Sequence, residues 1–208
     1  MSLPSRLLGA NPSIQVSTLL SGSLSTPSAK AEFEFGSFNS IASVIGDGSS
    51  STITFSSIPS TYQHLQLRFQ GRIAVAGGGS VYNAVIRFNS DTGSNYTWHA
   101  LRGTGSSAVA YASASETKIT VDSVFPDSNV TANVFATAIV DIHDYVSTSK
   151  NKTVRAFSGY DTNGAGNVWL QSGVWLNTNA ITSITITNNA TSNFVAGSVF
   201  SLYGIKGA

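Results

Sequence analysis

Residues 64–70 read His-Leu-Gln-Leu-Arg-Phe-Gln, a strict alternation of polar and apolar side chains. Successive side chains of a β-strand point to opposite faces, so Leu65, Leu67 and Phe69 share one face and the polar residues share the other. One face then packs on a core while the other stays at a surface, as is common in antiparallel sheets. This stretch predicts a half-buried antiparallel strand.

The same period of two recurs along most of the chain. Residues 134–143 carry apolar side chains on both faces, which predicts a central strand. Further strands are predicted at 32–35, 52–55, 81–88, 96–102, 108–114, 117–122, 153–159, 167–177, 181–188 and 198–205. No stretch holds the 3.6-residue period of an amphipathic helix. We therefore expect an all-β fold, an antiparallel two-sheet sandwich of jelly-roll type, whose strand order the sequence leaves open.

The N-terminal segment differs from the rest. Residues 1–35 include Pro4, Pro12 and Pro27 among many Ser and Gly residues, and they show little sustained periodicity. This composition predicts an extended arm at residues 1–35, which a partner holds for attachment or for clasping a neighbouring subunit. The β-sandwich domain is then expected at residues 36–208.

Composition excludes several classes of protein. Charged residues make up 10% of the chain, against about 25% in an average domain, and Ser and Thr together make up about a quarter. The 11 Lys and Arg are scattered and the net charge is +1, so we expect no nucleic acid partner. No apolar run is long enough for a membrane span, which predicts a soluble protein made in a cytoplasm. The absence of cysteine excludes disulfides, Cys-ligated zinc and a cysteine nucleophile.

Two short segments are candidates for chemistry. Asp141-Ile142-His143-Asp144 places Asp141 and His143 on one strand face with Asp144 just beyond, as a catalytic or metal site would require. The alternative is a strand end that becomes solvated. The loop at residues 89–95 is rich in oxygen ligands like a calcium loop, but Asp, Asn and Gly are also ordinary turn residues. The turn and strand-end interpretations are favoured, and we expect no metal and no cofactor.

A third candidate lies on the strand predicted at 167–177. Trp169, Gln171 and Trp175 share one face, with Gly173 between them. A glycine beside exposed aromatic rings forms a shelf on which sugars stack, so the three residues are candidate binding residues for a glycan or a subunit. The alternative is that both faces of the strand are buried, because Trp rings are more often packed than displayed.

Three phrases carry a resemblance to a known group of proteins. They are residues 57–68 (Ser-Ile-Pro-Ser-Thr-Tyr-Gln-His-Leu-Gln-Leu-Arg), residues 87–96 (Arg-Phe-Asn through Asn-Tyr) and residues 197–204 (Gly-Ser-Val-Phe-Ser-Leu-Tyr-Gly). Over residues 40–208 the chain resembles β-rich virion structural proteins of tailed bacteriophages, especially those of cyanobacterial and other aquatic hosts. The resemblance implies a non-enzymatic structural component with a jelly-roll-like body, often assembled as a homotrimer.

The expected function follows from the resemblance and the composition together. A charge-poor, hydroxyl-rich β-sandwich suits contacts repeated by symmetry in a lattice. We expect a head decoration or cement protein of a virion, which binds itself and the major capsid protein or another virion protein. The alternative is a tail or tail-fibre component that contacts host glycans. A glycan hydrolase is disfavoured, because it needs two carboxylates across a cleft and only Asp141 and Asp144 are close in sequence.

Overall fold

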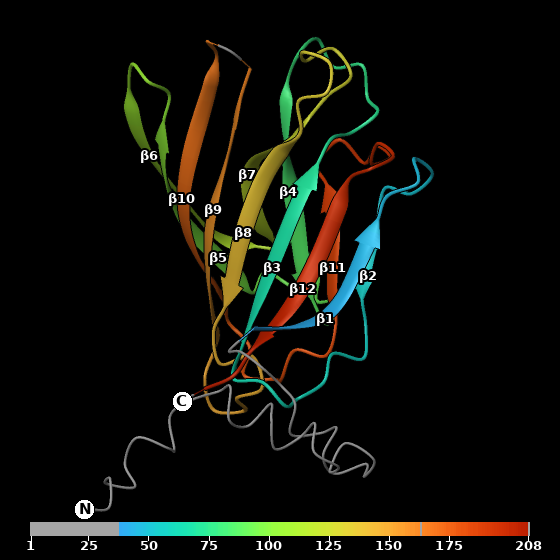
Figure 1. The fold of residues 1–208 in the computed structure, drawn as a ribbon. Coiled ribbons are helices and arrows are strands. Elements are labelled where there is room, and N and C mark those ends of the chain that lie inside the picture. Colours follow the sequence, from blue (N-terminus) through green and yellow to red (C-terminus); the bar gives the residue numbers. More distant parts are fainter. Residues whose placement is uncertain (1–37, 163, 208) are drawn as a thin grey trace, which may run out of the picture. The chain divides into compact units, whose positions relative to one another are not determined.

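The computed structural model describes residues 38–162 and 164–207, so the arm predicted at residues 1–35 lies outside the described residues. The described residues form strands and no helix (Figure 1). The strands are β1 (Phe38–Ile45), β2 (Ile53–Phe55), β3 (His64–Gly71), β4 (Val81–Phe88), β5 (Tyr96–Gly103), β6 (Ala108–Glu116), β7 (Ile119–Pro126), β8 (Ala136–Ile142), β9 (Lys152–Asp161), β10 (Gly166–Trp175), β11 (Ile184–Asn188) and β12 (Val199–Ile205). In this part of the chain no helix is long and apolar enough to cross a bilayer.

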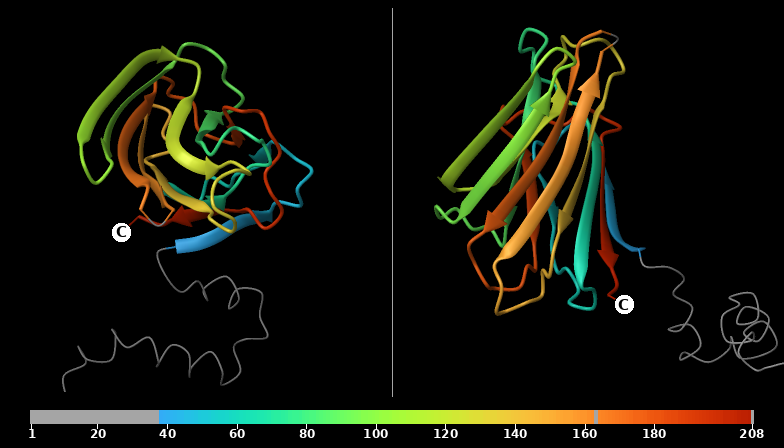
Figure 2. Two further views of the ribbon diagram at one scale, coloured as in Figure 1. Left: turned by 90° about the horizontal axis from the view of Figure 1, so that it is seen from above. Right: turned by 90° about the vertical axis from the view of Figure 1, so that its left-hand side faces the viewer.

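The strands form two antiparallel sheets, which confirms the predicted all-β sandwich. The larger sheet has eight strands in the order β1-β12-β3-β8-β9-β10-β5-β6, and the smaller has four in the order β2-β11-β4-β7. The larger sheet curves around β7, which contacts β3, β5, β8, β9 and β10 (Figure 2). The larger sheet therefore has an inner face toward the smaller sheet and an outer face directed away from it.

The core lies between the inner faces of the two sheets. Leu65, Leu67 and Phe69 of β3 are buried, as the alternation at 64–70 predicts, and β8 is central, as its apolar character on both faces predicts. Phe69, Phe125, Phe194 and Phe200 form an aromatic cluster, with ring centroids 4.8 Å apart for the Phe194–Phe200 pair. Such packed aromatic rings contribute large buried apolar area and so dominate the stability of a core.

Strand β1 is the element that the sequence did not predict. Its residues, 38–45, lack a clean alternation because the pairing with β12 shifts register between Ser40 and Ala42. A bulge places two residues of one strand opposite one of its partner, which interrupts the period of two. Sequence periodicity alone therefore does not reveal this strand.

Candidate functional site

The structure places all three candidate binding residues of β10 on the inner face of the larger sheet. Trp169 is 7% exposed, Gln171 8% and Trp175 1%. The two rings are therefore not displayed on a surface as a sugar-stacking shelf requires, because β7 and the 89–95 loop contact this face. The alternative, that both faces of this strand are buried, holds only for the face that carries the Trp rings. Val168 and Leu170 on the opposite face are exposed.

Gln171 closes the free edge of β7. Its side-chain oxygen accepts a hydrogen bond from the backbone N–H of Asp122 (3.0 Å), and its amide nitrogen donates to the carbonyl oxygen of Thr120 (3.2 Å). The Oγ of Ser158 donates to the carbonyl oxygen of Asp122 at 2.8 Å. A primary amide carries both a donor and an acceptor, as a backbone peptide does. Gln171 thus takes the place of a neighbouring strand along β7.

The two Trp residues join separate parts of the fold. Trp169 Nε1 donates to Ser123 Oγ at 3.1 Å, and Trp175 Nε1 donates to Asp91 Oδ2 at 2.7 Å. A Cβ added to Gly173 would lie 2.9 Å from Cδ1 of Ile119, so the glycine gives room for β7 to pack on β10. The Trp–Gly–Trp pattern therefore serves the contact between the two sheets.

A buried carboxylate lies at the same contact. Asp122 Oδ2 accepts a hydrogen bond from Gln171 Nε2 (2.6 Å) and Asp122 Oδ1 accepts one from Asn83 Nδ2 (2.7 Å). Burial raises the pKa of Asp122, and the two hydrogen bonds oppose that rise. Because amide donors occupy both oxygens and the side chain is buried, this carboxyl group has no access to a substrate.

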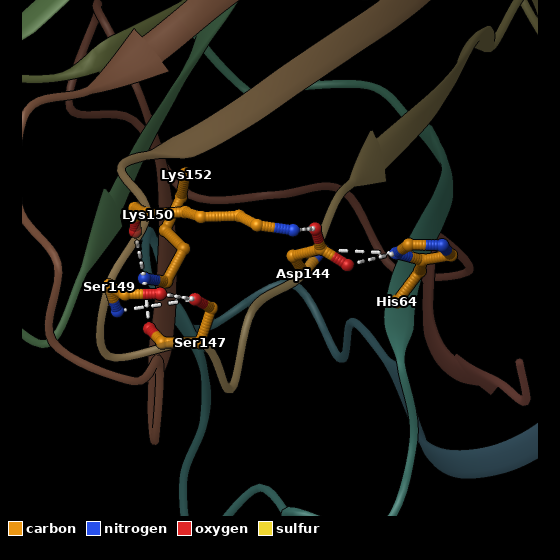
Figure 3. Close-up of polar contacts among 6 residues, drawn as sticks. All are labelled: His64, Asp144, Ser147, Ser149, Lys150 and Lys152. Carbon is orange, nitrogen blue, oxygen red and sulfur yellow. Dashed lines mark hydrogen bonds and ion pairs between the residues drawn. The ribbon is translucent and has the colours of Figure 1, made fainter.

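The strand-end candidate at 141–144 is held by structural contacts (Figure 3). Asp144 accepts a hydrogen bond from Lys150 Nζ at 2.7 Å, and this bond is the main reason that its pKa is lowered. His64 Nδ1 accepts the backbone N–H of Asp144 at 2.9 Å. The same nitrogen lies 3.7 Å from Oδ1 of Asp144. These contacts close the loop that follows β8.

The other charged groups of this loop are also engaged. Lys152 is buried, and its Nζ donates to the carbonyl oxygens of Ser147, Lys150 and Thr178 at 2.6–3.0 Å. Asp141 lies on the outer face, where it accepts a hydrogen bond from Gln66 Nε2 at 2.7 Å. Among residues 38–162 and 164–207, no three His, Asp or Glu side chains form a group that could hold a metal ion. The structure thus favours the strand-end interpretation.

The oxygen-rich loop at 89–95 is an Asx-type turn. Asp91 Oδ1 accepts the backbone N–H of Gly93 at 2.8 Å, and Asp91 Oδ2 accepts Asn95 Nδ2 at 2.9 Å as well as the Trp175 indole. The hydrogen bonds from Asn95 and Trp175 hold the pKa of Asp91 below its ordinary value. Since N–H donors occupy both oxygens, the loop is a turn that anchors Trp175, as the turn interpretation predicts.

The outer face of the larger sheet carries the strongest candidate for a functional surface. Ile139, Phe157, Leu170 and Leu101 are directly opposite one another on the neighbouring strands β8, β9, β10 and β5. Each is between 41% and 54% exposed. We call these four residues the apolar band. It continues to Ala110 on β6 and ends at Arg68 on β3, so with Ala110 it crosses five strands and is about 19 Å long.

A hollow of about 670 Å³ lies over the apolar band. Its rim is polar and includes His99, Asp141, Arg155 and Ser172. The hollow opens on an exposed sheet face, and half-exposed side chains form its floor. An apolar centre inside a polar rim is the usual anatomy of a protein–protein contact, and contiguous exposed apolar patches mark such contacts.

The apolar band was missed in the sequence because strand β10 is apolar on both faces. Alternation assigns Trp169 and Leu170 to opposite faces, but it does not tell which face is covered. The bulky Trp side chains suggested a display surface, whereas the smaller Leu and Val side chains are the exposed ones. The sequence does contain one signal of the apolar band. Ile139, Phe157 and Leu101 are each a large apolar residue on the face of its strand that otherwise carries mainly polar or small residues.

Comparison of the chain with protein-family models, with curated proteins and with solved structures finds no match in any of the three.

Proposed function

We propose that this protein is a non-enzymatic structural subunit that assembles with other copies of itself and with a larger structure through the outer face of its eight-stranded sheet. The observation that carries the proposal is the apolar band, whose four large side chains are contiguous and about half exposed. Leaving such a patch in water is unfavourable by about 25 cal/mol for each Å² of apolar surface. A covering partner would remove this cost.

The chemistry around the band supports a protein partner. The chain has only 10% charged residues, and the band itself contains no charged side chain. Arg155 and Asp141 lie at the rim, where a charge can stay solvated or pair across a contact. Burying an unpaired charge destabilises an interface, so a surface with no charge at its centre and charges at its rim suits association.

The chemistry of the remaining residues supports a non-enzymatic function. The carboxylates of Asp91, Asp122 and Asp144 each accept hydrogen bonds from structural donors. Lys152 is likewise engaged with three backbone carbonyls. A general acid or nucleophile needs a free position for the substrate. In the described part of the chain, the candidate clusters serve to close loops.

The resemblance at residues 57–68, 87–96 and 197–204 supports the proposal that this assembly belongs to a bacteriophage virion. On that basis we propose a head decoration or cement protein that is bound to the capsid shell as a symmetric oligomer. The proposed oligomer is a homotrimer, because the proteins that the chain resembles often form trimers. Weak contacts repeated by symmetry give strong overall attachment through effective concentration. The sandwich would then present its outer face to the shell or to neighbouring subunits.

The connectivity supports a jelly-roll derivation of the sandwich. In a jelly roll the chain passes back and forth between two packed sheets. Here β2, β4, β7 and β11 belong to the smaller sheet, whereas β3, β5 and β12 belong to the larger one. The larger sheet is wider than the four strands of a jelly-roll layer because β9, β10, β5 and β6 extend it beyond β8. We propose a jelly roll whose two layers are β1-β12-β3-β8 and β2-β11-β4-β7, widened by these four strands.

The alternative is a tail or tail-fibre component. Glycan stacking on exposed rings of Trp169 and Trp175 would support a glycan-binding tail component, and the burial of both rings removes that support. A tail position without glycan binding stays an alternative, which the experiment below separates from a head position.

The experiment adds the purified full chain to phage particles that lack it and images the particles. We expect bound protein in symmetric clusters on the head. Phe157→Asp should abolish addition, because it places a charge in the band. Thr153→Asp is the matched control, since Thr153 is exposed on the same face of β9 outside the band. Density on the tail would favour the alternative, and failure of the wild-type chain to bind any particle would contradict the proposal.

A further inference from the structure

Strand β6 forms an unprotected edge of the larger sheet. An exposed edge strand presents unpaired N–H and C=O groups to any other chain, so proteins shorten, bulge, charge or cover their edges. The other three edges have such protection. β2 has only three residues, β1 is bulged between Ser40 and Ala42, and the side chain of Gln171 caps β7.

β6 is bulged only near its end, between the residues that pair with Trp98 and Tyr96, and its preceding residues have none of these protections. Its nine residues read Ala-Val-Ala-Tyr-Ala-Ser-Ala-Ser-Glu, without Pro or Lys, and its single charge, Glu116, lies at the last position. Its register with β5 is regular from Ala108 to Ser113. Figure 1 shows β6 at the margin of the molecule, away from the smaller sheet. A strand of this kind is a template for strand addition.

The hydrogen-bond pattern shows which groups are available. Thr104 N donates to Ser107 O in the turn between β5 and β6. Antiparallel pairs alternate between bonded and non-bonded, so Val109 and Tyr111 bond to β5. The N–H and C=O groups of Ala108, Ala110 and Ala112 then point to the free edge.

Two buried side-chain nitrogens beside this edge also lack hydrogen-bond partners. Trp98 Nε1 and Arg102 Nε are the two buried side-chain nitrogens without a hydrogen-bond partner in the described part of the chain, and both lie on β5. On the outer face, Ala110 is directly opposite Leu101 of the apolar band. A strand added beside β6 would therefore bring its own apolar side chains into line with the band.

We propose that residues 13–20 of a neighbouring copy add to β6 as a further antiparallel or parallel strand. This inference rests on the proposed self-assembly and names its occupant. Residues 13–20 read Ser-Ile-Gln-Val-Ser-Thr-Leu-Leu, without Pro, Gly or charge, and Ile14 and Val16 alternate with polar residues. Pairing of β6 with a second β6 is less favourable, because Ala would face Ala and little apolar area would be buried.

The length of the chain and the position of its first described strand fit this occupant. Residues 21–37 link the segment to β1 and reach about 55 Å when extended. The strands β1 and β6 lie at opposite edges of the same sheet, seven strand spacings or about 34 Å apart. A segment that leaves near one edge and binds the opposite edge of the next copy makes a head-to-tail contact, and such contacts form a ring when the rotation between copies closes.

The first experiment measures association of full-length variants by sedimentation. Ala110→Pro removes an edge N–H without removing a bond to β5, and Val16→Pro removes an N–H from the added segment. Each should raise the dissociation constant of the oligomer about tenfold or more, because backbone hydrogen bonds are lost at the contact. Ala110→Thr and Val16→Thr keep the N–H and should associate as the wild type does. Equal association of the Pro and Thr variants would overturn the inference.

The second experiment identifies the two partners. The chain has no cysteine, so Val16→Cys in one copy and Ala110→Cys in a differently tagged copy give a single possible mixed product with a flexible bismaleimide. We expect a covalent dimer that contains both tags. Oligomers without the mixed product would overturn the strand addition and leave the proposed self-assembly standing. A double variant that cross-links only within one chain would also overturn it, and absence of any oligomer would contradict both proposals.

Discussion

The two faces of β10 carry similarly apolar residues but have opposite environments. On the inner face, Trp169, Gln171 and Trp175 are buried, and each makes a hydrogen bond to another element. On the outer face, Val168 and Leu170 are 46% and 54% exposed and lie with the apolar band. The inner face therefore stabilises the fold, and the outer face is available for association. Substitutions on the two faces should affect different measurements.

The largest expected effect on stability concerns Trp175, the last residue of β10, whose side chain lies on the inner face. Trp175→Ala removes a ring that packs on Phe88 and Tyr96 and leaves Asp91 without its indole donor. We expect a loss of about 4 kcal/mol in the free energy of unfolding, measured in urea. Val168→Ala on the outer face of the same strand is the matched control. Similar losses for the two variants would show that the two faces do not differ as described.

The next effect concerns the side chain that caps β7. Gln171→Leu keeps the approximate volume but leaves Asp122 N and Thr120 O without their partner. We expect a loss of about 2 kcal/mol, because buried polar groups become unsatisfied. Gln70→Leu, on the exposed side of β3, should change stability little. An unchanged unfolding midpoint for Gln171→Leu would contradict the capping role.

A smaller effect depends on pH. Asp91 has a lowered pKa in the folded protein, so its carboxylate contributes fully to stability above the unfolded pKa near 4. That contribution is lost as the pH falls through the lower, folded pKa. Asp91→Asn should therefore be about 1.5 kcal/mol less stable than wild type at pH 7. The difference should shrink toward pH 2 in urea unfolding curves, and a constant difference would contradict the assignment.

The smallest effect on stability is expected within the apolar band. Leu170→Ser should change the free energy of unfolding by less than about 1 kcal/mol, since more than half of the side chain is already exposed. The measurement uses dilute protein, so that association does not add to the apparent stability. A loss as large as that of Trp175→Ala would mean that the band belongs to the core.

Periodicity predicted most of the strands but not their arrangement. The strand at 81–88 and the burial of Leu65, Leu67 and Phe69 follow from side-chain alternation. Strand order depends on pairings between residues far apart in the chain, such as Leu67 with Val140, and local periodicity contains no record of these pairings. The bulge in β1 interrupts the alternation of side chains, so local periodicity does not reveal that strand.

The candidate site was harder to predict than the fold. Exposed and buried strand faces that are both apolar look alike in sequence, so the sequence alone does not show that Trp169 and Trp175 are buried while Leu170 and Phe157 are exposed. The favoured interpretations of 141–144 and 89–95 agree with the structure, because hydrogen bonds from Lys150 and Asn95 engage the carboxylates. Those partners are near in sequence, within six residues. The band instead joins side chains of four different strands, and β5 is far from the other three in the chain.

The most direct test of the account is the oligomeric state of the full chain in solution, measured by analytical ultracentrifugation at micromolar concentration. We predict that the wild type sediments as an oligomer and that Phe157→Asp sediments as a folded monomer with an unchanged unfolding midpoint. Thr153→Asp should sediment as the wild type does. A monomeric wild type, or a Phe157→Asp variant that keeps the oligomer, would contradict the claim that the outer sheet face is an assembly surface.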